Sequence, residues 1–296
     1  MSHQILLIVN PKAGRGKVQK KIPQIKQDLI NSGYIVEIAY TKKKMGVKEI
    51  IDNCKVKPDI VICCGGDGTV NDLTNAIMLL DEKPKISFIP LGTVNDFAKT
   101  IGLSRIRFLL PDIFKKYSEI KADVGKFNNK YFNYVAAFGA FTPVSYVTSQ
   151  KLKNCFGKFA YFIVAIKYLF KIRSYKVELI VDGEKIEKEC IYASISNSKS
   201  IGGFQWFRKR DIAVNDGKFE VILVQKPKKK TDYINIIFNI FFKRYNSKNF
   251  FYKQGNNIHI KTDKGVNWTI DGEFGGRTKE ANIENYSQEV TYVIPK

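Results

Sequence analysis

The stretch DIVICCGGDGTVND, residues 59–72, combines an apolar run, a glycine-rich turn and the start of a helical pattern. Residues 60–64 are apolar or β-branched, which is typical of a buried strand. Residues 65–69 break this run, and from Val70 onward apolar side chains follow at spacings of three and four. A glycine turn between a strand and a helix N-terminus is a natural anion site, because backbone N–H groups point out of it and the helix dipole adds positive charge.

Asp67, in the middle of this turn, does not suit a simple anion site. Its carboxylate repels a phosphate unless a cation shares the site, so Asp67 points to a divalent metal or to a bound proton. The glycines of the turn let a phosphate or a second stretch of backbone approach closely. The competing interpretation is an ordinary strand-to-helix turn in which Thr69 caps the helix.

Two further glycine-bearing loops follow predicted strands. The sequence NPKAGRGK, residues 10–17, comes after a strand at residues 4–9, and PLGTVNDF, residues 90–97, comes after a strand at residues 86–89. The first loop matches neither a Walker A loop nor a dinucleotide fingerprint, because its glycines fall at the wrong positions. Ligands of parallel sheets bind at the carboxyl ends of the strands, so three polar loops at one edge favour a phosphate site there.

Strands and helices alternate through the first part of the chain, with a further strand expected at residues 34–40 and a helix at 48–53. Such alternation predicts a parallel sheet with helices on both faces. After about residue 126 the pattern becomes strand-like and typical of antiparallel sheets. We expect an α/β domain over residues 1–125 and a mainly β domain over residues 126–296. The strands expected in the second domain are residues 176–181, 185–194, 218–224, 257–262, 267–270 and 289–294.

The net charge limits the class of partner. The chain has 49 Lys and Arg against 28 Asp and Glu, a formal charge of +21. That charge predicts an anionic partner: a nucleic acid, a phosphorylated ligand or an acidic membrane surface. A basic bias of the whole source proteome is the competing explanation. No nucleic-acid-binding module is recognised in the sequence, so we expect no nucleic acid partner.

Cysteines, histidines and apolar runs disfavour several classes of protein. Five cysteines, an odd number without a C-x-x-C pair, indicate reduced thiols, and two histidines are too few for a histidine-based zinc site. Residues 1–10 show no secretory leader. The apolar runs at residues 159–170 and 233–242 are shorter than the about 20 residues that span a bilayer. We expect a cytoplasmic protein in which residues 158–171 and 233–242 are core or interface helices.

Four stretches together resemble one known family. GGDGTVND (residues 65–72), PLGTVNDFAK (90–99), NPKAGRGK (10–17) and WTIDGE (268–273) resemble motifs of the diacylglycerol kinase catalytic family, which includes bacterial soluble lipid kinases, sphingosine kinases and ceramide kinases. GGDGT alone is shared with NAD kinases and phosphofructokinases. The resemblance covers nearly the whole chain. It implies an α/β nucleotide-binding domain followed by a two-layer β-sandwich-like domain, with the active site in the interdomain cleft.

The resemblance implies a lipid kinase that transfers the γ-phosphoryl group of ATP, with Mg²⁺, to a lipid hydroxyl. Diacylglycerol, giving phosphatidic acid, is the favoured acceptor, and sphingoid bases, undecaprenol-like alcohols and phosphatidylglycerol stay open. Asp67 and Asp96 match two acidic positions that the family needs. Lys99 stands where the family often has an arginine, which keeps the charge but loses a bidentate donor pair. The residues implied to line the nucleotide are Asn10, Pro11, Lys12, Thr41, Gly65, Gly66, Asp67, Gly68, Thr69, Val70, Asn71 and Thr93.

Glu273 matches the general base of the family, which takes the proton from the lipid hydroxyl as its oxygen attacks the γ-phosphate. The same tripeptide, Asp-Gly-Glu, also occurs at residues 182–184. There it lies between two expected strands, and Asp-Gly is a strong hairpin signal, so we interpret that copy as a plain turn. The copy that ends at Glu273 is followed by Gly275 and Gly276, a less ordinary turn.

The sequence VNDGK, residues 214–218, resembles the Asp-Asp-Gly loop that holds a structural Mg²⁺ in the family. Asn215 replaces the first aspartate of that loop and removes one carboxylate. A hairpin turn is the competing interpretation. The resemblance also implies that Asp123 links this metal to the active site. The implied ligands are the Asp216 carboxylate and the carbonyls of Ala213 and Lys218.

Basic and aromatic segments predict contact with a membrane. Residues 42–44 and 228–230 are lysine runs, and residues 203–210 combine aromatic side chains with cations, which suits the headgroup layer. We therefore expect peripheral association with an anionic membrane, from which the lipid is taken. Solvated surface is the competing interpretation of the lysine runs. The oligomeric state stays open, a homodimer included.

Two other functions compete with a lipid kinase. An NAD kinase shares GGDGT, but the later GTxNDF and DGE motifs belong to the lipid-kinase pattern. A catalytically silent protein that binds an anionic membrane is the second alternative. The presence of Asp67, Asp96 and Glu273 disfavours it.

Overall fold

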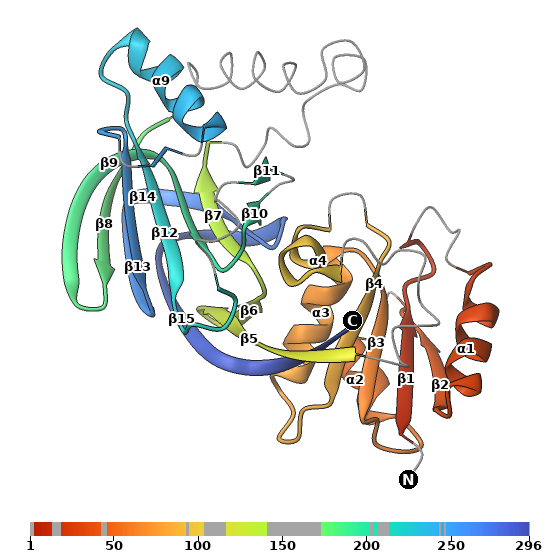
Figure 1. Ribbon diagram of the computed structural model, residues 1–296. Helices are drawn as coiled ribbons and strands as arrows, with labels where there is room; N and C mark the ends of the chain where they lie inside the picture. The colour runs from red at the N-terminus through yellow and green to blue at the C-terminus, as the bar shows by residue number, and fades with distance from the viewer. Residues whose placement is uncertain are drawn as a thin grey trace.

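The computed structural model shows an α/β part joined to a mainly β part (Figure 1). The first part carries a parallel sheet with helices on both faces, and antiparallel strands dominate the second. The fold class predicted from the sequence is confirmed. The residues that the structure describes are 3–13, 19–42, 46–92, 95–103, 117–140, 173–201, 204–205, 213–242, 244–245 and 247–295.

Four parallel strands form the sheet of the first part in the order β2-β1-β3-β4. Each matches an expected strand to within one residue. The strand β3 is buried along its whole length, because both faces of the sheet are covered, and its sequence is therefore a continuous apolar run. The four strands are β1 (Gln4–Val9), β2 (Ile35–Tyr40), β3 (Ile60–Gly65) and β4 (Lys85–Pro90).

Helices cover the two faces of this sheet (Figure 1). Leu29 of α1 lies in one apolar cluster with Leu7, and Leu73 of α3 lies in another with Leu6. Successive residues of β1 thus feed opposite faces, as a strand requires. The helices are α1 (Ile22–Asn31), α2 (Val47–Asp52), α3 (Asp67–Ile77) and α4 (Asp96–Ile101).

In the second part, the long strands β9 and β14 each pair with several other strands. The first half of β14 pairs with β8 and its last residues pair with β7, while β9 pairs with β8, β7 and β12. Trp268 is fully buried between the rings of Phe127 and Phe138, each 4.8 Å away, at the centre of this core. The strands are β5 (Tyr117–Phe127), β6 (Lys130–Phe132), β7 (Val135–Gly139), β8 (Tyr175–Val181), β9 (Glu184–Ser196), β12 (Phe219–Gln225), β13 (Phe250–Gly255), β14 (Asn257–Ile270) and β15 (Glu273–Pro295), with the small pair β10 (Ser200–Ile201) and β11 (Phe204–Gln205).

The structure corrects the sequence prediction at several strands. The expected strands 257–262 and 267–270 are one strand, β14, with an irregularity in its pairing between Lys261 and Val266. The expected strand 289–294 is only the end of β15, which has 23 residues. The strands β5, β6, β7 and β13 were not anticipated. The expected helix at residues 158–171, Thr93, Cys155 and most of the 203–210 segment lie outside the described residues.

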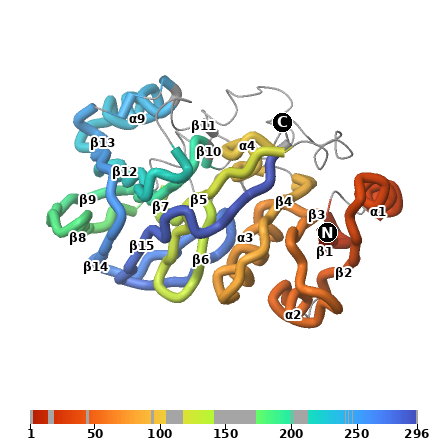
Figure 2. The backbone as a smooth tube through the Cα atoms, turned by 60° about the horizontal axis from the view of Figure 1, so that its bottom comes forward, coloured from red at the N-terminus to blue at the C-terminus, as the bar shows by residue number. Residues whose placement is uncertain are grey.

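The last strand, β15, crosses from one part of the molecule to the other (Figure 2). It pairs with β14 over its first half, then with β5, and finally Tyr292 lies beside Ile86 of β4 in parallel. As a result, thirteen of the described strands join one sheet. Backbone hydrogen bonds therefore help to hold the two parts together, and the domain boundary near residues 125 and 126 stays a prediction.

One more helix, α9 (Lys230–Phe241), lies at the edge of the second part and matches the helix expected at residues 233–242 (Figure 1). Among the described helices, none has the length and the apolar character that crossing a bilayer requires. The described cysteines are free thiols. Burial raises the pKa of Cys64 to about 12, which makes it a poor nucleophile.

Candidate active site

The glycine turn after β3 lies directly against the loop after β4. A side chain on Gly66 would place its Cβ 3.1 Å from Gly92 Cα, and one on Gly92 would come within 2.8 Å of Gly66 Cα. Two backbones that approach this closely leave room only for glycine. Gly66 also precedes the first residue of α3, so the turn ends on a helix N-terminus.

The loop after β1 reaches the same place. Asn10 donates its side-chain amide to Thr69 Oγ1 at 3.3 Å, and the Asn10 Oδ1 atom accepts the Lys12 N–H at 3.0 Å. The Thr41 N–H donates to the Val9 carbonyl at 3.0 Å, which places the end of β2 beside this loop. The described parts of the polar loops predicted to share one sheet edge are thus brought together. Residues 14–17 and Thr93 lie outside the described residues.

Asp67 carries the unusual electrostatics of the turn. Its Oδ2 atom accepts the Asp96 N–H at 3.2 Å, whereas its buried Oδ1 atom has no hydrogen-bond partner. Burial, and then the neighbouring Asp96 carboxylate, raise the pKa of Asp67 to about 6. A buried, unpartnered carboxylate oxygen at a turn that is expected to bind phosphate is suited to a cation, as the sequence suggested.

Asp96 is held by an unusual backbone. Asn95, the residue before it, adopts a left-handed conformation with φ of 52° and donates its side-chain amide to the Gly92 carbonyl at 2.8 Å. This turn directs Asp96, which is 1% exposed, toward the interior beside Asp67. The Lys99 ammonium lies 3.7 Å from Asp96 Oδ1 and partly balances its charge.

Glu273 lies against the glycine turn although it is far from it in sequence. A Cβ on Gly68 would collide with Glu273 Oε1, so the carboxylate occupies the space that the glycine leaves. Burial and the Glu273 charge together raise the pKa of Asp72, on the next turn of α3. The structure therefore brings the expected base, Glu273, onto the expected phosphate turn.

Asp271 is a buried site residue that the sequence analysis did not single out. Its carboxylate accepts the backbone N–H groups of Asn133 at 2.7 Å, Tyr134 at 3.0 Å and Val135 at 3.1 Å. It also accepts the Asn71 side-chain amide at 2.7 Å, which ties the turn to α3. Burial raises the pKa of Asp271, while these donors act in the opposite direction. Asp271 thus anchors the turn that carries Glu273.

The second Asp-Gly-Glu copy shows why the local turn sequence alone could not identify this anchor. Asp182 and Gly183 form a two-residue hairpin turn between β8 and β9, as expected, with φ of 49° and 87°. Asp271 and Gly272 form the same kind of turn, with φ of 47° and 85°. The two turns have the same local conformation, and only their tertiary neighbours differ. The proximity of Asp271 to Glu273 in WTIDGE was the available signal.

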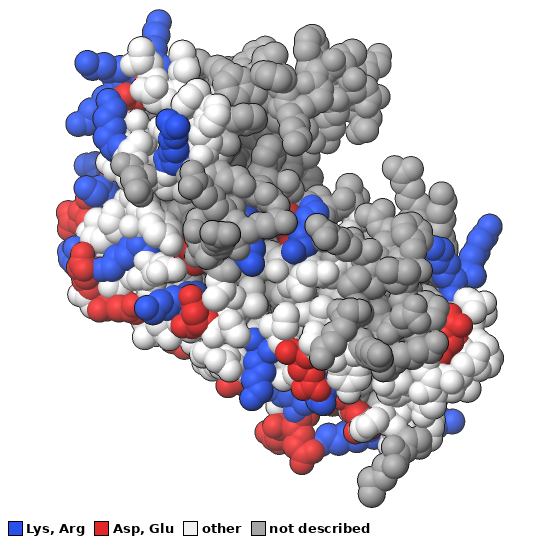
Figure 3. Space-filling view, viewed as in Figure 1, with Lys and Arg blue, Asp and Glu red and all other residues white. Residues whose placement is uncertain are grey.

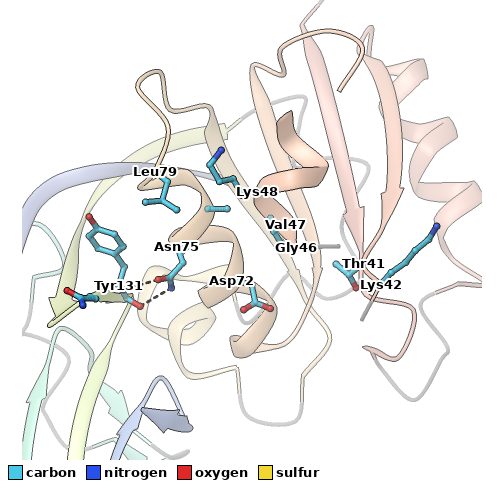
Figure 4. Close-up of a pocket in the computed structure, with 11 residues that line it drawn as sticks. Thr41, Lys42, Gly46, Val47, Lys48, Asp72, Asn75, Leu79 and Tyr131 are labelled. Carbon is cyan, nitrogen blue, oxygen red and sulfur yellow. Dashed lines mark hydrogen bonds between the residues drawn. The ribbon is translucent and has the colours of Figure 1, made fainter. Parts of the chain in front are cut away.

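A cavity of about 530 Å³ opens beside the site, between α2, α3 and β6 (Figure 4). Asn75 of α3 forms two 2.9 Å hydrogen bonds with the backbone of Tyr131, and these fix one wall. Asp72 lines the cavity and also neighbours Glu273, so the cavity adjoins the glycine turn. The lining residues are Thr41, Lys42, Gly46, Val47, Lys48, Asp72, Asn75, Ala76, Leu79, Asn129 and Tyr131.

The expected metal loop belongs to a second polar cluster. Asp123, 1% exposed, accepts the Gly217 N–H at 2.7 Å and the Gln288 N–H at 2.9 Å, so it braces this loop against β15. Asp216 is exposed, and its Oδ1 atom accepts the Lys218 N–H at 3.1 Å. Among the described residues, no group of three or more acidic, histidine or cysteine side chains is arranged to hold a metal by itself.

Comparisons with known proteins agree with this architecture. A model of the diacylglycerol kinase catalytic domain matches residues 4–127, and a model of the YegS C-terminal NAD kinase beta sandwich-like domain matches residues 137–286. A diacylglycerol kinase of Staphylococcus carnosus is 30% identical over 300 residues, covering 100% of this chain and 96% of that protein. A diacylglycerol kinase of Bacillus subtilis is 27% identical, covering 98% of this chain and 96% of that protein.

A solved structure shows the same fold. The crystal structure of a diacylglycerol kinase from Bacillus anthracis superimposes with a TM-score of 0.77 at 25% identity, covering 99% of this chain and 97% of that one. The chain therefore belongs to the diacylglycerol kinase family. The class predicted from the sequence, an ATP-dependent lipid kinase, is confirmed. The NAD kinase alternative is not better supported than the lipid kinase by these comparisons.

Proposed function

We propose that the enzyme transfers the γ-phosphoryl group of ATP to the hydroxyl of diacylglycerol and so forms phosphatidic acid. The observation that carries this proposal is the contact between Glu273 and Gly68. It places a carboxylate, the candidate base, at the turn where the donor phosphates are expected. The acceptor is inferred from the relatives named diacylglycerol kinase, which match nearly the full chain.

Different residues at and around the glycine turn have different roles in phosphoryl transfer. Backbone N–H groups of residues 65–69 and the N-terminus of α3 bind the phosphates, with the Lys12 and Lys99 ammonium groups adding positive charge nearby. Such transfer needs positioning and charge neutralisation more than covalent chemistry. Glu273 accepts the proton of the lipid hydroxyl as its oxygen bonds to the phosphorus atom, and ADP leaves.

Asp67 and Asp96 fit Mg²⁺. Asp67 Oδ1 is a buried oxygen without a hydrogen-bond partner, and the Asp96 carboxylate lies nearby. Two carboxylates are too few for a complete protein cage, and Mg²⁺ commonly completes its coordination with substrate phosphates and water. When bound, Mg²⁺ would neutralise charge on the phosphates during transfer.

The cavity between α2, α3 and β6 takes the nucleoside end of ATP in this proposal. Its volume of about 530 Å³ lies within the usual range for small-molecule sites. It offers Thr41, Asn75 and an aromatic ring at Tyr131, a mixture that suits a polar heterocycle and its ribose (Figure 4). Its contact with Asp72 places this end of the nucleotide next to the phosphate turn.

The loop at residues 214–218 is retained as a proposed second Mg²⁺ site with a poor fit. Asp216 offers the one carboxylate, with the carbonyls of Ala213 and Lys218 as proposed partners, and its Oδ1 atom already accepts a backbone N–H. If this loop binds metal, Mg²⁺ will raise the melting temperature of the wild type more than that of Asp216→Asn.

The lipid acceptor implies that the enzyme works at a membrane surface. We propose a peripheral association driven by the net charge of +21, since about 1 kcal/mol is gained per Lys or Arg near an anionic leaflet. A homodimer is retained as the proposed assembly, to be tested by light scattering at several protein concentrations.

A kinase assay with Mg²⁺-ATP and a panel of lipid alcohols in mixed micelles tests the function. Label is expected in phosphatidic acid, with lower rates for sphingoid bases and polyprenols. Glu273→Gln should lower kcat by about a hundredfold to ten-thousandfold. Glu184→Gln, in the other Asp-Gly-Glu copy, is the matched control and should keep full activity.

Three outcomes would contradict the proposal. Label in NADP rather than in a lipid would indicate an NAD kinase. No product with any lipid would favour the silent membrane binder. Equal activity of Glu273→Gln and Glu184→Gln would remove Glu273 from the mechanism.

A further inference from the structure

The helix α9 exposes large apolar side chains on its outer face. Ile234 is 56% exposed and Phe238 47%, and Phe242, at the end of the helix, is 46% exposed. A spacing of four residues places them in one row along the helix. On the inner face, Ile236 and Ile237 are buried in the core. A helix of a soluble domain usually carries polar residues opposite its packed face, and α9 carries apolar ones.

The side chains of this row lie close to one another on the surface. The rings of Phe238 and Phe242 lie 4.3 Å apart, and the Arg244 guanidinium lies 5.7 Å from the centre of the Phe242 ring. We call this row, Ile234 with Phe238 and Phe242, the apolar ridge. Contiguous exposed apolar surface of this kind marks an interaction site, whereas scattered single residues do not.

Positive charge surrounds the apolar ridge. Residues 226–248 include seven Lys and Arg and one acidic residue, Asp232. Asp232 is 3% exposed, accepts the backbone N–H groups of Lys228 and Lys229, and pairs with Lys248 at 3.1 Å. Its charge is therefore neutralised locally, and Figure 3 shows mainly Lys and Arg among the charged groups on the visible surface around α9.

We propose that the apolar ridge and its basic border form the surface by which the enzyme docks on an anionic lipid bilayer. Ile234, Phe238 and Phe242 enter the boundary between headgroups and acyl chains. Lys228, Lys229 and Lys230 contact the headgroup phosphates. Helices that lie in a membrane interface combine an apolar face with Lys and Arg in this way. The inference rests on the proposed function, because a kinase of membrane lipids must reach them in the bilayer.

The position of α9 suits this role. In Figure 1 the strand β1 runs upward from the N-terminus, so the carboxyl-end loops lie on the upper side of the molecule. The helix α9 lies on that same side (Figure 1). Docking through α9 therefore turns the side that bears the candidate active site toward the membrane, from which the acceptor comes.

Charge disfavours two other occupants. A second copy of the chain would bring one basic border against another, which is repulsive at short range. A nucleic acid would match the cations but would leave Ile234 and Phe238 against a polyanion. An anionic bilayer matches both the charge and the apolar ridge.

Sedimentation of the full chain with vesicles, without ATP, tests the proposal. Binding is expected to vesicles that contain phosphatidylglycerol and to be weak to pure phosphatidylcholine. The double substitution Ile234→Ser/Phe238→Ser should lower binding to anionic vesicles by at least about tenfold, because each exposed apolar side chain contributes to partitioning. Lys228→Gln/Lys229→Gln/Lys230→Gln should remove the preference for anionic vesicles and the sensitivity to salt.

A matched control uses equally exposed apolar residues elsewhere. Ile30 is 43% and Val56 54% exposed in the α/β part, and Ile30→Ser/Val56→Ser should bind vesicles as the wild type does. Thermal melts of each variant confirm that it is folded. Activity on a short-chain, water-soluble diacylglycerol should be unchanged in Ile234→Ser/Phe238→Ser, while activity on vesicles falls.

The outcomes separate this proposal from the proposed function. Unchanged vesicle binding of Ile234→Ser/Phe238→Ser would overturn the docking surface even if the enzyme is an active kinase. A wild-type dimer that this variant converts to a monomer would assign the apolar ridge to a second copy and also overturn it. Vesicle binding that depends on the apolar ridge, in a protein without kinase activity, would support the docking surface and contradict the proposed function.

Discussion

Asp271 shows how a single buried carboxylate can position a candidate catalytic group. It accepts three consecutive backbone N–H groups and the Asn71 amide, and it begins the turn that ends in Glu273. Charged acceptors make the stronger hydrogen bonds, so this anchor fixes the turn relative to α3. Because Glu273 follows two residues later, its distance from the glycine turn depends on Asp271.

Asp271→Asn should lower kcat by about a hundredfold, because a displacement of about 1 Å at a reacting group costs that much. The dissociation constant for ATP should change less, since the phosphate turn itself is intact. The matched control is Asp182→Asn, which loses similar hydrogen bonds in the twin turn, to Asn256 and Asn257. Both variants should lose about 1–3 kcal/mol of stability, but only Asp271→Asn should lose kcat. Equal kinetics in the two variants would make Asp271 merely structural.

At the scale of a single element, the strand β12 carries a buried glutamate. Alternation turns Phe219 and Val221 toward one core, whereas Ile222 belongs to the core on the other face. Glu220 shares the side of Ile222 and is fully buried, with Oε1 accepting the Gln254 amide at 3.3 Å and Oε2 unpartnered. Burial raises the pKa of Glu220 to about 8.

This raised pKa predicts a pH-dependent loss of stability. Between its ordinary pKa of 4.5 and about 8, Glu220 holds a proton in the folded state but not in the unfolded state. Stability therefore falls as the pH rises through this window, on the order of 1.4 kcal/mol per pH unit, and levels off above it. Glu220→Gln should remove this loss and become the more stable protein near pH 8. Urea titrations from pH 5 to 9 measure the difference, with the exposed Glu187→Gln as control.

If the stability difference between Glu220→Gln and the wild type stayed constant from pH 5 to 8, Glu220 would have an ordinary pKa. The buried Glu220 carboxylate would then be ionised at pH 5. It would need a cation nearby, because an unpaired buried charge is costly.

At the scale of the whole molecule, β15 couples the two parts. Tyr292, fully buried near its end, packs its ring 5.1 Å from Phe97 of α4. The Tyr292 hydroxyl donates to Asn133 Oδ1 at 3.0 Å. Asn133 Oδ1 also accepts the Thr74 hydroxyl at 2.7 Å. One side chain thus joins the parallel sheet, α3 and the start of the β part.

Tyr292→Ala should destabilise the protein by about 3–5 kcal/mol and uncouple the two parts, because it removes this junction. In a Trp206→Phe background, fluorescence reports Trp268 in the β part. Far-UV circular dichroism reports the helices, and those among the described residues lie mainly in the first part. The two signals should change together in the wild type and separately in Tyr292→Ala. Tyr292→Phe, which loses only the hydroxyl, should retain one transition. A single shared transition in Tyr292→Ala would show that other contacts carry the coupling.

The sequence predicted the local elements around the site well. The strands of the parallel sheet, the glycine turn and the helix that follows it were all expected, because apolar periodicity and turn glycines act over short distances. The long strands β14 and β15 were less predictable. Their bends and pairings depend on partners far away in the chain, which a local pattern does not identify.

By itself, the sequence determined the strand-turn-helix unit at residues 59–72 and the residue types that phosphoryl transfer needs. The resemblance to the family motif also favoured the Asp-Gly-Glu copy that ends at Glu273. The tertiary structure alone decided that Asp271 anchors this copy to α3, because Asp182 and Asp271 adopt the same local turn. It also decided that α9 keeps a second apolar face in solvent, since exposure depends on what packs against a helix and not on its periodicity. The physical reason is the same in both cases: dihedral preferences are local, while contact and burial are properties of the folded chain.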